Sequence, residues 1–256
     1  MQQPATPDEL QQRETALSQR FEAACQAGLS LDITRGKPSP EQLDLADALL
    51  AMPGSNTYTD ADGTDCRNYG GIDGLPAMKQ LFAEILGCQS ADVIVGGNSS
   101  LTMMHDAIVR GMLFGVPGGD QPWGQQGTVR FLCPAPGYDR HFEITGHLGF
   151  ELLNVDLTDQ GPDMDRVEAL AADPAVKGIW CVPRYSNPTG ITYSEEVTQR
   201  LAQMKAAPDF RIIWDNAYAE HHLGDVRQPV PDILAACRSE EHTSELQSQF
   251  RISYAV

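Results

Sequence analysis

From about residue 90 to residue 215 the sequence alternates short apolar segments with segments of helical periodicity. Between the first two apolar segments, Met104, Ile108 and Met112 recur at helical spacing. The apolar segments, each predicted as a strand, lie at 93–95, 129–133, 152–155, 178–182 and 211–214. Strands that are apolar throughout are typical of parallel sheets buried on both faces. The alternation therefore predicts an α/β fold with a mostly parallel sheet covered by helices on both faces.

The regions on either side of this alternation are less regular. The first 30 residues predict an acidic amphipathic helix with Asp8 as its N-cap and Gly28 at its end, and a loop-rich stretch follows. Residues 238–256 lose the apolar periodicity, and the string 238–248 resembles a translated sequencing-library adaptor. We expect this tail to be an artefact, with a genuine mobile tail as the alternative. The natural sequence is then expected to end near Cys237, which would leave the sheet incomplete.

The chain is strongly acidic, with 18 Lys and Arg residues against 35 Asp and Glu residues and a formal net charge of -17. Such a surface repels phosphate backbones and anionic lipid headgroups, so we expect no nucleic-acid partner and no membrane partner. No apolar run approaches the roughly 20 residues of a membrane span. The N-terminus also lacks the basic start and apolar core of a signal peptide.

The residues that commonly bind metals are poorly arranged for that purpose. Six scattered cysteines with no C-x-x-C pair suit neither a zinc site nor a disulfide framework. His221 and His222 are adjacent, and adjacent side chains point apart in a strand, so we expect no metal site there. Reduced thiols in apolar segments predict a cytoplasmic protein.

The segment after the first predicted strand, Gly96 to Leu101, combines two glycines with a run of small polar residues. Glycine lets the backbone approach a ligand closely. The polar residues would open a helix whose N-terminal amides favour an anion, and phosphate is the natural ligand. Gly97, Asn98 and Ser99 are the residues that we expect to hold it. A plain helix cap is the alternative, since serine is common at N-caps.

Three further motifs stand where predicted strands end. Tyr138 follows the second strand, where it would either stack on a heteroaromatic ring or pack on a hydrophobic rim. Asn187 follows the fourth strand in an Asn-Pro pair, which a plain turn would also explain. Asp215 ends the fifth strand, and a buried acid costs several kcal/mol unless it is paired or hydrogen-bonded. Asp215 therefore requires a cationic partner, or else it caps a following helix.

Taken in order, these motifs resemble the signature of the fold-type I pyridoxal-phosphate (PLP) enzymes, in particular the class I/II aminotransferases. Pro-x-x-x-Asn-Pro-Thr-Gly at 183–190, followed by Asp-x-x-Tyr at 215–218, is the pattern of that family. The strings 31–38 and 68–74 look most like a bacterial aspartate aminotransferase subgroup. The resemblance implies that residues 1–70 form an N-terminal helix and a substrate-side segment. It implies a partial PLP-binding large domain over residues 71–237, ahead of the expected artefact tail 238–256.

The resemblance implies a role in PLP binding for the motif residues around the ring. Asp215 would pair with the protonated pyridine nitrogen and keep the ring an electron sink. Asn187 and Tyr218 would hydrogen-bond the phenolic oxygen. Tyr138 would stack on the face of the ring.

Other positions match the family pattern around the phosphate and the substrate. Gly97, Asn98 and Ser99 would hold the phosphate at the N-terminus of a helix. Tyr69 matches a tyrosine that reaches the phosphate of the neighbouring subunit, which implies a homodimer. Gly36 matches the glycine that lines the substrate pocket, to which Asn187 also belongs.

The reaction that the resemblance implies is the PLP-dependent transfer of an amino group between an amino acid, aspartate in this subgroup, and a 2-oxo acid. That chemistry needs a lysine that forms a Schiff base with PLP, one strand beyond the Asp-x-x-Tyr motif. The four lysines of this chain, at 37, 79, 177 and 205, all precede Asp215. We therefore expect this polypeptide to lack the catalytic lysine and to be inactive. The alternatives are a catalytically inactive PLP-binding or scaffold protein, and a PLP lyase or decarboxylase of the same fold.

Overall fold

The computed structural model of the protein describes residues 6–30, 36–52, 54, 56–225, 232–239 and 252–254. The chain divides into two compact units, Met1–Tyr58 and Thr59–Val256. The first unit contains helices α1 (Pro7–Gln26), α2 (Pro40–Asp44) and α3 (Asp47–Leu50), none of which buries a residue among those described.

The start of α1 differs from the prediction that Asp8 would cap it. Thr6 is the N-cap, and its hydroxyl accepts a hydrogen bond from the backbone N–H of Glu9 while the Glu9 carboxylate accepts from the backbone N–H of Thr6. Pro7 occupies the first turn, where its missing N–H costs nothing. The Thr-Pro-Asp-Glu string thus forms a capping box that begins two residues before Asp8.

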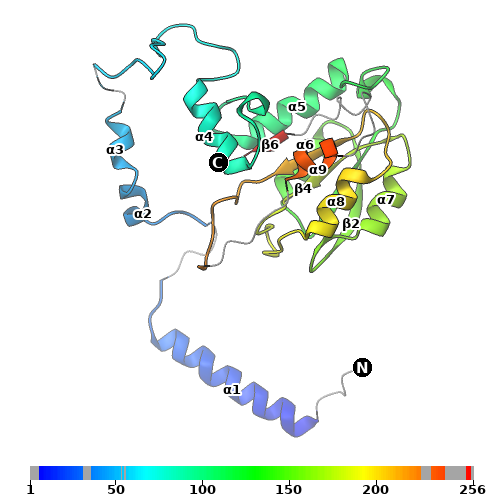
Figure 1. Ribbon diagram of the computed structural model, residues 1–256. Helices are drawn as coiled ribbons and strands as arrows, with labels where there is room; N and C mark the ends of the chain where they lie inside the picture. The colour runs from blue at the N-terminus through cyan, green and yellow to red at the C-terminus, as the bar shows by residue number, and fades with distance from the viewer. Residues whose placement is uncertain are drawn as a thin grey trace. The chain divides into compact units, whose positions relative to one another are not determined.

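The second unit is built on one sheet, with helices packed around it (Figure 1). The strand order of the sheet is β3-β2-β1-β4-β5-β6. All neighbouring strands are parallel except β2 and β3, which pair antiparallel. The strands are β1 (Arg130–Ala135), β2 (Glu151–Thr158), β3 (Gly161–Pro162), β4 (Val176–Cys181), β5 (Arg211–Asp215) and β6 (Ile252–Tyr254). The predicted α/β fold with a mostly parallel sheet is confirmed.

Helices connect these strands, as parallel pairing requires. The α-helices are α4 (Pro76–Leu86), α5 (Ser100–Phe114), α6 (Asp139–His147), α7 (Met164–Ala171), α8 (Glu195–Gln203) and α9 (Ile233–Ser239). Two short 3-10 turns, η1 (Ser90–Asp92) and η2 (Trp123–Gln125), flank α5 in the sequence. Ser194 and Asp163 cap helices α8 and α7, because their side chains accept hydrogen bonds from backbone N–H groups in the first turns.

Two apolar cores, one on each face of the sheet, hold these helices in place. In one core Phe131 and Trp180 of the strands are buried with Met104 of α5. In the other, Leu132 and Ile179 are buried with residues of α7, α8 and α9. The neighbours Phe131 and Leu132 belong to opposite cores because successive side chains of a strand point to opposite faces. Helices therefore cover both faces, as predicted.

The predicted strand at 93–95 is wrong. These residues are in no strand of the described structure, and the backbone N–H of Val95 donates instead to the carbonyl oxygen of Asp73 at 2.9 Å. Val93 is buried, but Ile94 is 65% exposed. Only one of these three side chains is fully buried, and the backbone of the segment bonds to a loop. The segment therefore gains too little apolar burial to form a strand of the sheet.

Strand β6 lies inside the segment 238–256 that the sequence predicts to be an artefact tail. It pairs in parallel with β5, with Ile252 opposite Ile213 and Tyr254 opposite Asp215. This pairing describes where the segment lies and does not bear on its origin. The artefact tail and the expected domain boundaries stay predictions.

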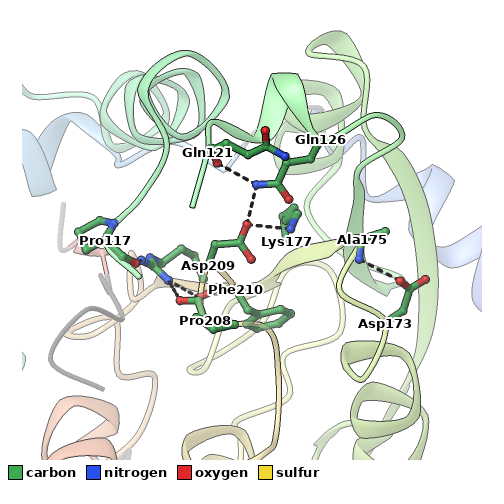
Figure 2. A network of polar contacts seen from close by, with 10 residues as sticks. Pro117, Gln121, Gln126, Asp173, Ala175, Lys177, Pro208, Asp209 and Phe210 are labelled. Atoms are coloured by element: carbon green, nitrogen blue, oxygen red, sulfur yellow. Dashed lines mark hydrogen bonds and ion pairs between the residues drawn. The ribbon is translucent and has the colours of Figure 1, made fainter. Parts of the chain in front are cut away.

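A buried ion pair lies where β4 and β5 begin, at the end of the strands opposite to their carboxyl ends. Nζ of Lys177 lies 2.7 Å from Oδ2 of Asp209, and the two side chains are 3% and 7% exposed. Nε2 of Gln126 donates to the same carboxylate oxygen at 3.0 Å and to the carbonyl oxygen of Gln121 at 2.8 Å. Figure 2 shows both donors reaching Asp209. The segments that precede β1 and β5 are thereby tied together.

The six cysteines, all within the described residues, are free thiols. Cys133 and Cys181 are buried in the sheet, and burial raises the pKa of the Cys133 thiol to about 12. These two residues thus behave as small apolar side chains. No helix in the described ranges is both long and apolar enough to cross a bilayer.

Candidate functional site

The motif residues gather where the parallel strands end. Tyr138 lies shortly after β1, Asn187 lies on the segment that follows β4, and Asp215 is the last residue of β5. The chain runs from β1 to β2 on one side and later to β4 on the other, so the strand order reverses between β1 and β4. In α/β proteins ligands bind outside the carboxyl ends of the strands at such a reversal.

A cavity of about 280 Å³ opens at this edge of the sheet. Its volume lies just below the range of roughly 300 to 1,000 Å³ that is typical of small-molecule pockets. It brings together six residues that the sequence singles out: Asn98, Ser99, Tyr138, Asn187, Asp215 and Tyr218. The remaining lining residues are Ser100, Leu101, Val182 and Ala217.

Three sequence-predicted residues do not line this cavity. Gly97 precedes Asn98 in the chain but is not among the lining residues. Tyr69 is fully exposed, with no contact to the cavity within this chain. Gly36 lies in the first compact unit and is not among the residues that line the cavity.

Asp215 is the most constrained polar group of the cavity. The residue is 5% exposed, its Oδ1 accepts a hydrogen bond from the backbone N–H of Ala217 at 3.2 Å, and its Oδ2 lies 2.9 Å from Nε2 of His141. The partner that a buried acid requires is thus a histidine on α6. Asp215 nevertheless borders the cavity, so a ligand placed there meets a buried carboxylate.

His141 is the site residue that sequence reasoning missed. It is 1% exposed, its ring stacks on Trp180 with centroids 4.6 Å apart, and the ring of Tyr138 packs edge-on against it at 5.2 Å. The sequence did indicate that Asp215 needs a partner. It did not indicate which residue that partner is, because the chain has six histidines that could pair with a carboxylate. The pair is separated by 74 residues, and only the fold brings β5 beside the start of α6.

Replacing His141 by phenylalanine is expected to lower the free energy of unfolding by about 1 to 3 kcal/mol. Phenylalanine can keep the stacking on Trp180, but it leaves Oδ2 of Asp215 buried without its partner. Urea denaturation monitored by circular dichroism measures the change. The matched control is His147→Phe, an exposed position on the same helix, where we expect a change within about 0.5 kcal/mol. Equal effects at both positions would contradict this account of the pair.

The N-terminus of α5 forms another wall of the cavity. Ser99 is its N-cap, with a hydroxyl 3.4 Å from the backbone nitrogen of Thr102, which donates to it, and 3.1 Å from the Thr102 hydroxyl. The capping interpretation of this motif is therefore correct for Ser99. It does not compete with anion binding, because Asn98, Ser99 and Ser100 all line the cavity at the positive end of a helix of 15 residues.

The aromatic residues of the cavity come from two different connections. Burial raises the pKa of the Tyr138 hydroxyl, which keeps this side chain neutral. The ring of Tyr218 packs edge-on against His221 with centroids 5.7 Å apart. Each tyrosine thus has a ring neighbour that restricts its orientation.

A larger hollow, of about 390 Å³, lies between α5 and α6. Its charged residues Arg140 and Glu143 form an exposed ion pair of 3.2 Å with each other. It contains no residue from a strand end and no buried polar side chain. The smaller cavity is therefore the better candidate site. Within the described ranges, no cluster of three or more His, Cys, Asp or Glu side chains could hold a metal ion.

Comparison with known proteins identifies the family. The sequence model of the family described as aspartate amino-transferase matches residues 3–255. The chain belongs to this family. An aspartate aminotransferase of Corynebacterium glutamicum is 51% identical over 219 residues, which cover 85% of this chain and 51% of that protein. A structural counterpart of this aminotransferase chain is a solved aspartate transaminase, also from Corynebacterium glutamicum. It is 44% identical with a TM-score of 0.84, over 98% of this chain and 58% of that one.

More distant aminotransferases share the fold alone. An alpha-aminoadipate aminotransferase of Thermus thermophilus superposes with a TM-score of 0.59 at 20% identity, over 86% of this chain and 50% of that one. Across these relatives the chain spans between 50% and 58% of their length. The resemblance predicted from the motifs at 183–190 and 215–218 is thereby confirmed at the level of the family.

Proposed function

We propose that the cavity binds pyridoxal 5′-phosphate and that the chain carries this cofactor's half of an aspartate aminotransferase site. The observation that supports this most is that one cavity combines the buried carboxylate of Asp215 with the N-terminus of α5. The carboxylate would bind a cationic group of a ligand, and the helix N-terminus would bind an anionic group at the other end of the same ligand. A phosphorylated, protonated pyridine has both.

The residues present fit this cofactor on three further points. Asp215 has Oδ1 and Oδ2 held by Ala217 and His141, so its carboxylate is fixed before any ligand arrives. Asn98, Ser99 and Ser100 offer small polar groups to a phosphate without a competing carboxylate among them. Tyr138 supplies an aromatic face, while Asn187 and Tyr218 supply an amide and a hydroxyl for a ring oxygen.

When bound, this cofactor supplies an electron sink for the α-carbon of an amino acid. The chain's own residues prepare that chemistry. Asp215 holds a proton at the ring nitrogen, and His141 fixes the carboxylate from behind. Tyr138 covers one face and excludes water there. Asn187 and Tyr218 would donate hydrogen bonds to the ring oxygen and so orient the bound ring.

The substrates and partners that we propose follow from the family. The amino donor is aspartate and the acceptor a 2-oxo acid, in a cytoplasmic homodimer without nucleic-acid or membrane partners. Tyr69 supports the dimer, because a fully exposed tyrosine is free to reach the phosphate of a second subunit. Gly36 is proposed to line the substrate pocket.

The 256-residue polypeptide on its own is proposed to bind the cofactor without turning over aspartate and 2-oxoglutarate. No lysine follows Asp215 in the sequence. Lys177 is buried against Asp209, Lys79 is paired with Asp73, and neither lines the cavity. Among the described residues, those that line the cavity include no lysine, so the proton transfer that a site lysine provides has no donor there.

Titration with pyridoxamine 5′-phosphate (PMP) tests the proposed site, because PMP needs no lysine to bind. We expect saturable one-to-one binding, measured by calorimetry or by the fluorescence of the ligand, with competition by inorganic phosphate. A chain that is folded by circular dichroism and binds no PMP would refute the proposal.

Borohydride reduction in the presence of PLP is expected to leave no pyridoxyl label that depends on the site. Exposed lysines such as Lys205 react only at random, so any labelling should be unaffected by excess PMP. Peptide mapping by mass spectrometry measures the label at each of the four lysines. A stoichiometric label on one lysine that PMP suppresses would show that a lysine does reach the cavity.

A further inference from the structure

Two connections carry the ring-contacting residues into the cavity, and they leave neighbouring parallel strands. The connection after β4 carries Asn187, and the one after β5 carries Tyr218. Each connection is irregular, so neither helix nor strand geometry fixes where these two side chains point. Their relative position must be set by contacts between the connections.

One such contact joins the side chains of Tyr185 and His222. The Tyr185 hydroxyl lies 2.8 Å from Nδ1 of His222, and the two rings pack edge-on with centroids 5.9 Å apart. Oε2 of Glu220 lies 4.0 Å from Nε2 of the same ring. The His222 side chain is 10% exposed, although Leu223 beside it is fully exposed.

A second link runs in parallel with the first. Nη1 of Arg184 donates to the carbonyl oxygen of Ala219, which lies next to Tyr218 and is 2% exposed. The two links connect residues 35 and 37 positions apart in the sequence. Neither Tyr185 nor His222 lines the cavity itself.

The backbone of Tyr185 is held in an unfavourable conformation. Its φ is 49°, and it is the only non-glycine residue with positive φ that the described part of the chain contains. A bulky side chain rarely adopts this conformation, and such residues persist only where their surroundings over-determine them. Two contacts hold Tyr185 in this conformation. One is the contact with His222, and the other is the hydrogen bond from the Tyr185 N–H to the Thr192 hydroxyl.

We propose that Tyr185 and His222 form a positioning pair that fixes Asn187 and Tyr218 against the ring oxygen of the cofactor. This inference rests on the proposed function. Asn187 lies two residues after Tyr185, and Tyr218 lies four residues before His222. The hydrogen bond between the pair therefore sets the spacing of the two ring-contacting side chains.

The test compares PMP with 3-deoxypyridoxamine phosphate, an analogue that lacks the ring oxygen. Tyr185→Phe and His222→Gln are each expected to weaken PMP binding about 5-fold, the effect of losing one hydrogen bond. The double variant is expected to be no weaker than either single variant, because both remove the same interaction. Binding of the deoxy analogue should not change, since it has no ring oxygen for Asn187 and Tyr218 to contact.

Two further variants complete the design. His222→Asn places an amide where Nδ1 stood, and we expect it to restore most of the PMP affinity. His147→Gln, an exposed histidine outside the cavity, should leave PMP binding as it is. Thermal melts of all variants accompany the titrations.

The outcomes separate the two proposals. A wild-type chain that binds no PMP overturns the proposed function and this inference with it. Wild-type binding that is unchanged in Tyr185→Phe and His222→Gln overturns the positioning pair alone. Equal weakening for PMP and for the deoxy analogue also overturns it, because that result indicates general damage to the cavity.

Discussion

Replacing Asp215 by asparagine is expected to weaken PMP binding by at least about 30-fold. The substitution keeps the shape of the side chain and removes the charge that would hold a protonated ring nitrogen. A hydrogen bond to a charged group contributes about 2 kcal/mol, which corresponds to that factor. The effect should be large because Asp215 is 5% exposed, so water cannot replace the lost interaction. Isothermal calorimetry with PMP measures it.

Two controls make the result specific to the ring nitrogen. The affinity for inorganic phosphate, obtained from its competition with PMP, should be unchanged in Asp215→Asn, since a phosphate would contact the N-terminus of α5 and not the carboxylate. Asp159→Asn removes a charge from an exposed turn and should leave PMP binding unchanged. If phosphate and PMP lose affinity together, the substitution has distorted the cavity, and Asp215 is not the partner of the ring.

Much of the fold could be predicted because the apolar segments are continuous and regularly spaced. The segments at 129–133, 178–182 and 211–214 each correspond to a strand whose side chains fill both cores. The segment at 93–95 has the same composition, yet it pairs with a loop. Local apolarity predicts that a segment is buried, and it cannot predict which backbone will lie beside it.

The candidate site was predictable where its residues stand at strand ends. Because the carboxyl ends of parallel strands meet at one edge, motifs that follow different strands must converge there. This rule brings Tyr138, Asn187 and Asp215 together without any knowledge of side-chain packing. Asn98 and Ser99 follow a different rule. They stand at the start of a predicted helix, and the N-terminus of a helix favours the binding of an anion.

The supporting contacts could not be predicted, because they depend on pairs with no sequence pattern. His141 is one of several polar residues on an amphipathic helix, and nothing local distinguishes it from the exposed His147. Tyr185 stands inside a motif whose recognised residue is Asn187, while its partner belongs to an adjacent histidine pair. Such contacts depend on the positions of irregular connections in the folded chain, which no local sequence pattern predicts.

Lys177 illustrates the same limit within a strand. A lysine in an apolar segment is expected at a strand end or a solvent edge, and Lys177 is instead completely enclosed. Its anion, Asp209, comes from a loop 32 residues later. The sequence does not indicate this partner, which the parallel pairing of β4 with β5 brings beside Lys177.

Replacing Asp209 by alanine is expected to lower the free energy of unfolding by about 3 to 5 kcal/mol. The substitution leaves the Lys177 ammonium group buried with no carboxylate beside it, and Gln126 loses an acceptor as well (Figure 2). A loss of this size is a large fraction of the roughly 5 to 15 kcal/mol that stabilises a typical domain. Urea denaturation measures it. PMP affinity at low temperature should not change, because the pair lies at the opposite end of the strands from the cavity.

The cost should come from the unpaired charge and not from the absence of an ion pair as such. Replacing a buried pair by apolar side chains of similar volume is often neutral, since neither charge then has to be desolvated. The double variant Lys177→Met/Asp209→Leu is therefore expected to recover most of the stability that Asp209→Ala loses. A double variant as unstable as the single one would mean that this position demands the polar network itself, including the hydrogen bond from Gln126. In that case the network would be required to join the segments that precede β1 and β5.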